Sequence, residues 1–487
     1  MLKKIDLSFV IAAYVYLATP VLLFIGGWVK WPLSIPLILI ILVAVVRGIK
    51  QFGGYRELVM TQKLAIKAAL IGVVLAIWVA YSGIGGFSFQ NQDFQFRNAV
   101  FHDLIDFDWP LIYTYYDIPN QPKGALVYYL AYWLPAALFG KFFGFDAANV
   151  FLYAWTVLGI SLFFYFVSRY INAVSFVTLL LLIFWSGLDF IGEVTEYNPV
   201  FIGQHIEWWA MMYQYSSNTT ALYWVFNQVL APWLILAFIL NDRNAKSIVF
   251  VYSLCFLSAP FSCVGLAPFV AVRVLFLNGF GLHNLKAMLS FQNCVAAPLI
   301  MAVSIAYYLS NSKTIGSLGG QAYDTVFNNL NVYCKFIVLE FLVYFMLLFT
   351  VHKKNPLYYT VLGVLLLLPF YKIGVGNDFV MRVSLPALMM LMILVVQFFL
   401  SKNNPHSLLK SVLLMFLLIG AITPINEMYR SVTNTALYDK EHYIKDKLKT
   451  LSVFKREYEA YNIPNVPYVA YVSLGYKQSF FFRYLSP

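Results

Sequence analysis

The chain has 487 residues, of which 61% are hydrophobic and only 11% are charged, and its mean hydropathy is +0.73. This composition leaves too little polar surface for a soluble globular protein. A spanning helix needs roughly twenty apolar residues, so the length allows about eleven to thirteen of them. We therefore predict an all-α, polytopic helical membrane protein, and despite the net charge of +11 we expect no nucleic-acid partner.

Apolar segments follow one another along most of the chain and predict a transmembrane domain over 1–425 with a small external cap over 426–487. The short segment 172–187 and the interrupted segment 248–276 are expected to be broken helices beside a cavity. The four cysteines lie in or beside apolar runs and are expected to be unpaired. The predicted spans are 7–28, 32–48, 64–83, 125–141, 147–167, 172–187, 219–240, 248–276, 292–309, 335–351, 357–371, 383–400 and 408–424.

Basic short loops predict the orientation, because such loops are usually cytoplasmic. They are 47–63, 241–246, 352–354 and 402–410. The acidic loop 87–123, the stretch 371–382 and the C-terminal cap then lie outside. Counting spans forward and backward gives opposite sides for 187–218, so one earlier segment cannot be a simple span. We expect that segment to be the short piece 172–187, which is the weakest of the predicted spans before this loop.

The first long polar loop, 87–123, contains an amphipathic pattern that predicts a helix lying flat on the membrane surface. Asp93 and Arg97 are four residues apart and can pair on such a helix. The loop is either an anchor with solvated acids or the wall of a site. The expected apolar side holds Phe96, Val100, Phe101, Leu104 and Ile105, and the expected polar side holds Asp93, Arg97, Asn98, His102, Asp103 and Asp106.

A second polar interruption, 188–218, together with the helix after it, predicts a sugar or acceptor pocket. Its tryptophans could stack on a pyranose ring, although a tryptophan belt at the membrane interface explains them as well. A divalent cation such as Mg²⁺ or Mn²⁺ is left open, with Asp93 or Asp189 completing a His-x-Glu pair. The pocket candidates are His205, Glu207, Trp208, Trp209, Asn218, Asn227 and Gln228.

Cationic and acidic residues also interrupt two late apolar segments. Lys372 precedes a predicted helix start at which Asp378 could act as the cap, and Arg382 follows one turn later. Arg382 could bind a lipid phosphate in a forked geometry, or it could pair with Asp378 or reach a head group. Glu340 lies within an apolar run and must face a partner or the interior, for either a structural or a catalytic reason.

The stretch 64–145 resembles the opening module of the GT-C membrane glycosyltransferases. The resemblance lies in an acidic residue, Asp93, beyond a membrane helix, an Arg-containing surface helix that ends in Asp108-Trp109-Pro110, and the run Pro122 to Trp133 with Leu138-Phe139-Gly140. In the aminoarabinose transferases and protein mannosyltransferases of that superfamily, a carboxylate on the first external loop is the base or a metal contact, which implies such a role for Asp93. This chain departs from them in having two preceding helices and Gln92-Asp93 in place of an acidic pair. The whole chain also resembles uncharacterised bacterial membrane proteins encoded among polysaccharide genes.

The resemblance implies a bacterial inner-membrane enzyme that transfers a sugar, with inversion, from a polyprenyl-phosphate donor to a glycan, lipid or protein acceptor outside the cell. Asp93 would be the base, Arg382 and Lys372 would hold the phosphate, and Arg97, Asp189, Glu340 and Asp378 are further candidates. Two alternatives stay open. A lipid-linked oligosaccharide transporter or flippase would show two superposable halves, and an O-antigen or capsule polymerase or ligase would use external arginines.

Overall fold

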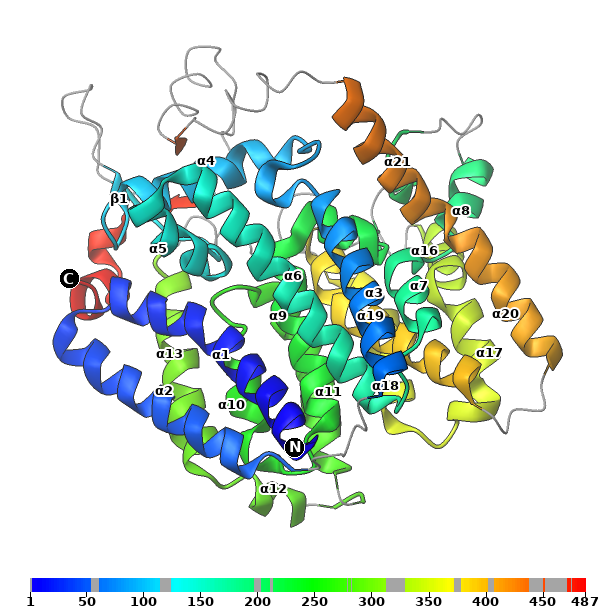
Figure 1. Ribbon diagram of the computed structural model, residues 1–487, viewed down its shortest axis with the longest axis horizontal. Helices are drawn as coiled ribbons and strands as arrows, with labels where there is room; N and C mark the ends of the chain where they lie inside the picture. The colour runs from blue at the N-terminus through cyan, green and yellow to red at the C-terminus, as the bar shows by residue number, and fades with distance from the viewer. Residues whose placement is uncertain are drawn as a thin grey trace.

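The computed structural model is a bundle of helices (Figure 1). About 79% of the described residues are helical, and nine helices among them are long and apolar enough to cross a membrane. The chain is thus an all-α, multi-pass membrane protein in its secondary structure and hydropathy. The described residues are 2–53, 61–113, 124–196, 203–210, 213–277, 279–281, 283–311, 329–371, 378–401, 407–437, 450–451, 471–473 and 475–487.

Two helices form the centre of the bundle, α9 (Asn218–Asn241) and α19 (Asp378–Leu400). Nearly all of their residues are buried, and they contact each other and α11 (Pro260–Leu275). On its other side α9 packs along α6 (Phe145–Tyr170). Polar residues on α9 and α19 therefore face protein rather than lipid.

Outer helices carry rows of exposed apolar side chains. On α2 (Trp31–Gln51) the row includes Ile35, Leu39 and Val46, and α20 (Ser407–Gly420) exposes Leu414 and Leu418. Such stripes suit a lipid surface. The remaining outer helices are α1 (Leu2–Trp28), α3 (Gln62–Ala80), α17 (Val343–His352), α18 (Pro356–Leu367) and α21 (Ile422–Leu437).

The predicted span 125–141 is wrong. It contains β2 (Gly124–Leu126), an irregular stretch and α5 (Leu134–Phe143), a helix of 10 residues that is too short to cross. Its apolar residues are buried by other protein segments, and Tyr132 hydrogen-bonds Thr156 on α6. The conflicting side assignments of 187–218 thus come from this segment. In contrast, 172–187 joins a longer broken span, α7 (Phe176–Phe184) and α8 (Asp189–Glu196).

The break predicted within 248–276 is confirmed. α10 (Ile248–Ser253) is followed by turns, and α11 begins only at Pro260. Cys255 and Cys263 form a disulfide across this break, contrary to the expectation of unpaired thiols. The turn between the two helices brings the cysteines together, which a reading of apolar runs cannot detect. The helices that follow α11 in the chain are α12 (His283–Ala287), α13 (Ala297–Tyr308) and α16 (Leu330–Ile337).

A small antiparallel sheet joins the first polar loop to the C-terminal part of the chain. Its order is β1 (Ile112–Tyr113), β2, β3 (Val472–Ser473), and Ala125 pairs with both Ile112 and Ser473. Near the C-terminus, the carbonyl of Leu485 accepts a hydrogen bond of 2.8 Å from the Lys30 amide. The predicted boundary at 426 falls inside α21, and the described parts of the cap pack on the bundle.

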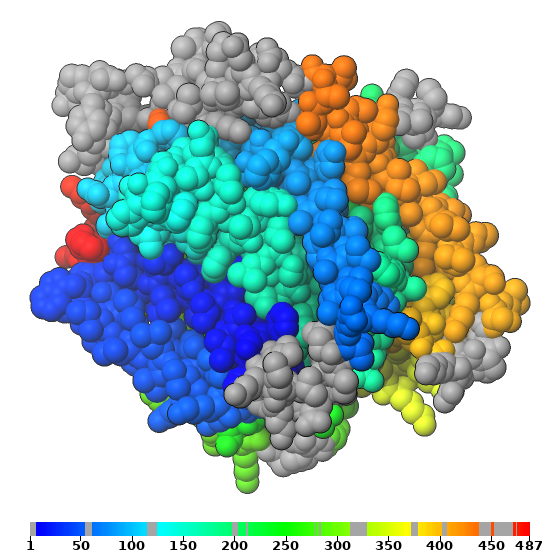
Figure 2. All heavy atoms as spheres, viewed as in Figure 1, coloured from blue at the N-terminus to red at the C-terminus, as the bar shows by residue number. Residues whose placement is uncertain are grey.

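One end of the bundle collects the polar features of the chain. Figure 1 shows α4 (Asp93–Asp106) lying across this end, with α12 at the opposite end. The two segments that flank α4 on the surface, α3 and α21, meet here (Figure 2), where Ser431 donates a hydrogen bond to the carbonyl of Tyr81. We call it the α4 end; it holds the sheet and the starts of α9 and α19.

Candidate functional site

Helix α4 forms at the predicted position, but its surroundings differ from the prediction. Arg97, Asn98 and Asp103 are buried, although the helical pattern placed them on a solvated side. Protein covers them: Asn98 donates to Gln90, and the Tyr113 hydroxyl donates to Asp103 at 2.6 Å. The helix is therefore packed against other protein segments and does not lie alone on a lipid surface.

Asp93 and Arg97 form the predicted ion pair at the start of α4, with 2.9 Å between Asp93 Oδ2 and Arg97 Nη2. The Asp93 side chain is 42% exposed, whereas that of Arg97 is 6% exposed. The guanidinium lies over the ring of Phe226 at 5.2 Å. Its Nη1 atom is buried and has no hydrogen-bond partner in the described part of the chain.

Asp378 and Arg382 repeat this arrangement at the start of α19. Their atoms Oδ1 and Nη2 are 3.0 Å apart, and the side chains are 51% and 12% exposed, respectively. Arg382 Nη1 also donates to the Tyr129 hydroxyl at 3.1 Å, while Nε has no partner among the described residues. Lys372, the second predicted phosphate contact, lies outside the described residues.

Three tyrosines, Tyr128, Tyr129 and Tyr471, connect the two ion pairs; we call them the tyrosine cluster. The ring centroids of Tyr128 lie 3.8 Å from Tyr129 and 4.6 Å from Tyr471. Burial raises the pKa of the Tyr471 phenol well above its usual value, and Arg97 and Arg382 both act in the opposite sense. The same two guanidinium groups act on the pKa of Tyr128. Arg382 contacts the cluster through the Tyr129 hydroxyl, and α4 reaches it through Phe96, whose ring stacks on Tyr471 with 6.2 Å between centroids.

The two helix starts share a sequence motif. Asp93-Phe-Gln-Phe-Arg97 and Asp378-Phe-Val-Met-Arg382 both read Asp-Phe-x-x-Arg, and each begins a helix with the arginine one turn inside. Sequence reasoning treated the two pairs separately and did not connect them. The repeated motif is the signal that could have linked Arg97 with Arg382.

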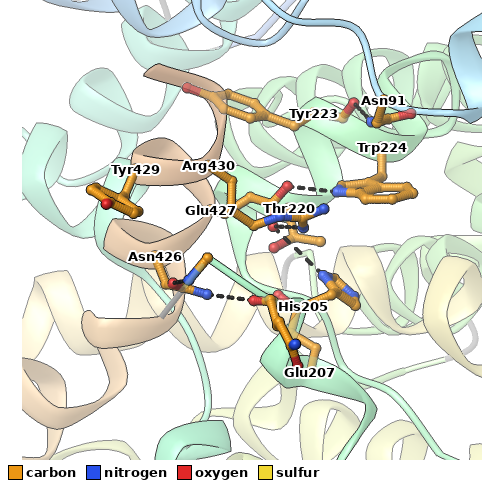
Figure 3. A network of polar contacts seen from close by, with 12 residues as sticks. Asn91, His205, Glu207, Thr220, Tyr223, Trp224, Asn426, Glu427, Tyr429 and Arg430 are labelled. Atoms are coloured by element: carbon orange, nitrogen blue, oxygen red, sulfur yellow. Dashed lines mark hydrogen bonds and ion pairs between the residues drawn. The ribbon is translucent and has the colours of Figure 1, made fainter. Parts of the chain in front are cut away.

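A second polar network lies beside the first on α9 and α21 (Figure 3). Glu427 is its centre: Oε2 lies 2.8 Å from Arg430 Nη1 and 3.6 Å from His205 Nδ1, and Oε1 accepts from the Trp224 indole at 2.7 Å. Burial disfavours a charge on His205, but the hydrogen bond to Glu427 and the charges of Glu207 and Glu427 outweigh it and raise the imidazole pKa. Sequence reasoning missed Glu427 and Arg430, although their spacing of three on an amphipathic helix was visible.

The structure separates the predicted pocket residues. Trp208 is 52% exposed and its ring stands edge-on to His205, with 4.9 Å between centroids, so the indole is accessible to a ligand. The His205 side chain is only 10% exposed and packs against this ring while it contacts Glu427. Glu207 accepts from the Ser217 amide, Trp209 donates to Glu340, and Asn218 donates to the carbonyl of Leu182. Because all three are buried and hydrogen-bonded within the protein, they position the loop and the start of α9 rather than line a sugar site.

Asn227 and Gln228 are buried in α9. Asn227 lines a cavity of about 20 Å³, shared with Tyr16, Tyr132 and Ser258, which is room for one water molecule and not for a sugar. Neither amide atom of Gln228 has a partner among the described residues. The structure thus places these two side chains in the packed core of the bundle and apart from the exposed ring of Trp208, and their role in sugar binding stays a prediction.

Glu340 and Asp189 lie close together inside the bundle, and both side chains are buried. Ser186 and Thr423 donate to Asp189 at 2.7 and 3.2 Å. This pair joins α8, α21 and η6 (Val338–Leu342). Within the part of the chain that is described, no three His, Cys, Asp or Glu side chains are grouped to hold a metal. Asp93 pairs with Arg97, whereas His205 and Glu207 both contact Gln214.

The α4 end thus offers an exposed carboxylate, two buried guanidinium groups and aromatic rings at one place. An exposed carboxylate can accept a proton, buried guanidinium groups can bind an anion, and aromatic rings can pack against a sugar or a lipid. Comparisons with models of known families, with curated proteins and with solved structures found no match.

Proposed function

We propose that this protein is an integral-membrane glycosyltransferase that moves a sugar from a polyprenyl-phosphate donor to an acceptor hydroxyl on the external face of the membrane. The observation that carries the proposal is the approach of Arg382 to the tyrosine cluster that also borders Asp93 and Arg97. The resemblance of 64–145 to GT-C enzymes gives the reaction class. The predicted orientation puts the α4 end opposite the basic loops, hence outside.

The proposed reaction needs one base and one anion site. The acceptor oxygen attacks the anomeric carbon as its proton passes to Asp93, the bond from that carbon to the donor phosphate breaks, and the phosphate takes the electron pair. Asp93 suits the base because its carboxylate is half exposed at the mouth of the site. Arg382 suits the phosphate because a guanidinium forks onto phosphate oxygens and stabilises the charge that develops on them.

The network around Glu427 suits the acceptor. It adjoins the donor site through α9, since Asn91, two residues before Asp93, donates to the carbonyl of Tyr223 at 3.1 Å. Trp208 offers an exposed ring beside His205. A glycan acceptor presents hydroxyl groups and apolar ring faces, which imidazole and indole groups can bind. We therefore assign acceptor binding to His205 and Trp208, and no resident cation is part of the proposed step.

A polymerase or ligase that uses a diphosphate-linked glycan is the second candidate. The convergence of Arg97 and Arg382 favours it, because two guanidinium groups match the larger charge of a diphosphate. The two candidates share the fold and the site. They differ in the donor that the enzyme consumes.

A transfer assay tests the proposal. Purified protein in lipid nanodiscs is incubated with radiolabelled polyprenyl-phosphate sugars, or with diphosphate-linked glycans, and a membrane extract as acceptor. We expect Asp93→Asn to lower the transfer rate by about 100-fold or more, as loss of a general base does. Arg382→Ala should also lower it. Asp106→Asn is the matched control, since Asp106 is an exposed carboxylate on the same helix.

The control variant should transfer at the wild-type rate. Wild-type turnover in Asp93→Asn would contradict the proposal. Transfer from the diphosphate-linked donor alone would replace the first candidate by the second.

A further inference from the structure

The buried guanidinium of Arg97 has fewer partners than its chemistry demands. A guanidinium carries five N–H donors. In the described part of the chain, Arg97 makes one side-chain hydrogen bond, to Asp93, and its Nη1 is buried without an acceptor. An unsatisfied donor on a buried charge is costly. A ligand with several acceptor oxygens would remove this cost.

The Asp93 carboxylate, which pairs with the Arg97 guanidinium, is easily displaced by another anion. Asp93 is far more exposed than Arg97, so it can turn into water, whereas the guanidinium stays between α4 and the ring of Phe226. Releasing the exposed partner of this pair costs little, because water solvates the freed carboxylate well. A phosphate brings more charge and more acceptor oxygens than a carboxylate, so it can replace Asp93 on Arg97.

We propose that Arg97 is a second phosphate-binding residue and that the donor phosphate displaces Asp93 from it, which frees Asp93 to act as the base. This inference rests on the proposed function. It makes catalysis ordered, because the carboxylate is held by Arg97 until a donor is bound. Asp378 and Arg382 share the same motif, burial difference and tyrosine cluster, so the same exchange applies on α19.

The proposal predicts opposite effects for the two members of one ion pair. Removing the competing carboxylate should strengthen phosphate binding, while removing the guanidinium should weaken it. A pair that only stabilises the fold would give the same sign for both changes, since each would loosen the start of α4. The sign of the Asp93 effect therefore separates the two roles.

Binding of sugar-free polyprenyl monophosphate to the protein in nanodiscs gives the measurement. We expect Asp93→Asn to bind roughly two- to fivefold more tightly, because the competing carboxylate is exposed and such a partner contributes only a modest free energy to an ion pair. Asp378→Asn should act in the same direction. Arg97→Gln should bind about tenfold or more weakly, as loss of hydrogen bonds to a charged group does. Asp106→Asn is again the control and should bind as wild type.

Two further probes identify the ligand. Polyprenyl diphosphate that binds more tightly than the monophosphate would assign two phosphate groups to the two arginines, and binding of inorganic phosphate would show that the lipid is dispensable. Weaker binding in Asp93→Asn, or unchanged binding in Arg97→Gln, would overturn the proposal. Should Arg97→Gln fail to fold, binding by Arg97→Lys and Asp93→Asn is measured instead. Lysine keeps the positive charge but cannot make two parallel hydrogen bonds to a phosphate, so Arg97→Lys should bind more weakly than wild type.

The binding assay and the transfer assay fail independently. Suppose that the variants change phosphate binding in the expected directions but the wild type transfers sugar from no donor. The proposed function would then be wrong, whereas the exchange of Asp93 for phosphate on Arg97 would still be supported. Transfer that depends on Asp93, combined with the wrong sign of binding, would remove only the exchange.

Discussion

Asp103 shows how the burial of one carboxyl group links pH to stability at the α4 end. It is fully buried on α4, where it accepts hydrogen bonds from the Tyr113 hydroxyl and from the Leu451 amide at 3.3 Å. Burial raises its pKa to about 7, although these two hydrogen bonds act in the opposite sense. The folded protein therefore holds this proton up to near-neutral pH, whereas the unfolded chain releases it near pH 4.

The stability of the wild type should consequently fall as pH rises from about 4 to about 7, because the folded state binds the extra proton in this window. Asp103→Asn keeps an acceptor for Tyr113 and removes the titration, so its stability should depend less on pH there. Thermal unfolding in detergent between these pH values measures both slopes, with Asp146→Asn, which changes an exposed carboxylate at the start of α6, as the control. Equal slopes in wild type and Asp103→Asn would refute this account of Asp103.

Local spacing predicted part of the site. The pairing of Asp93 with Arg97 and of Asp378 with Arg382 follows from a separation of four residues on a helix. The burial of Arg97 did not follow, because the covering ring belongs to Phe226 on α9, far away in sequence. Asp103 was predicted to lie on a solvated side because its partners are also distant in sequence. They are Tyr113 on β1 and the amide of Leu451.

At the scale of elements, the loop that carries Trp208 is docked on α21. Asn426 donates to the carbonyl of Gln204 at 2.6 Å and accepts from the Gly203 amide at 2.8 Å. His205 adds its contact with Glu427, as Figure 3 shows. The position of the proposed acceptor surface thus depends on a helix more than two hundred residues away in sequence.

The docking of this loop should depend on pH. The pKa of His205 is raised in the folded protein, so the charged imidazole contributes stability below its unfolded pKa, near 6.5, and this contribution is lost as pH rises through the folded value. We expect faster amide hydrogen exchange in 203–210 at pH 8.5 than at pH 6, after correction for the intrinsic rates. His205→Gln should abolish the difference. An identical pH response in that variant would contradict the role of His205.

Helices that cross the whole bundle were the easiest to predict. The sequence ranges of α1, α2, α3, α6 and α9 were close to the observed ones, since long apolar runs with short loops allow few alternatives. The prediction of a span at 125–141 was wrong because an apolar composition indicates only that a segment is shielded from water. It does not indicate whether lipid or other parts of the protein shield it. Tyr128 and Tyr132 are buried among helices and hydrogen-bonded there, which hydropathy alone does not reveal.

At the scale of the whole molecule, the candidate site is assembled from four distant parts of the chain. They are the start of α4, the segment at Tyr128 and Tyr129, the start of α19, and Tyr471 next to β3. The pattern of basic loops predicted that the starts of α4 and α19 and the region of Tyr471 share one end of the bundle, and they do. The segment at Tyr128 and Tyr129 was predicted to belong to the span 125–141 instead. Their contact through three tyrosines could not be predicted, because it depends on the packing of α9 and α19 and on the return of the chain to β2.

The coupling between Asp93 and Arg382 in sugar transfer is the most direct test of this assembly. Values of kcat/KM are measured for Asp93→Glu, Arg382→Lys and the double variant, with Asp106→Asn combined with Arg382→Lys as the matched control cycle. Groups that act as a unit have non-additive effects. We predict that the double variant loses about as much activity as the worse single variant, while the control cycle is additive in free energy. Losses that multiply in both cycles would contradict a shared site.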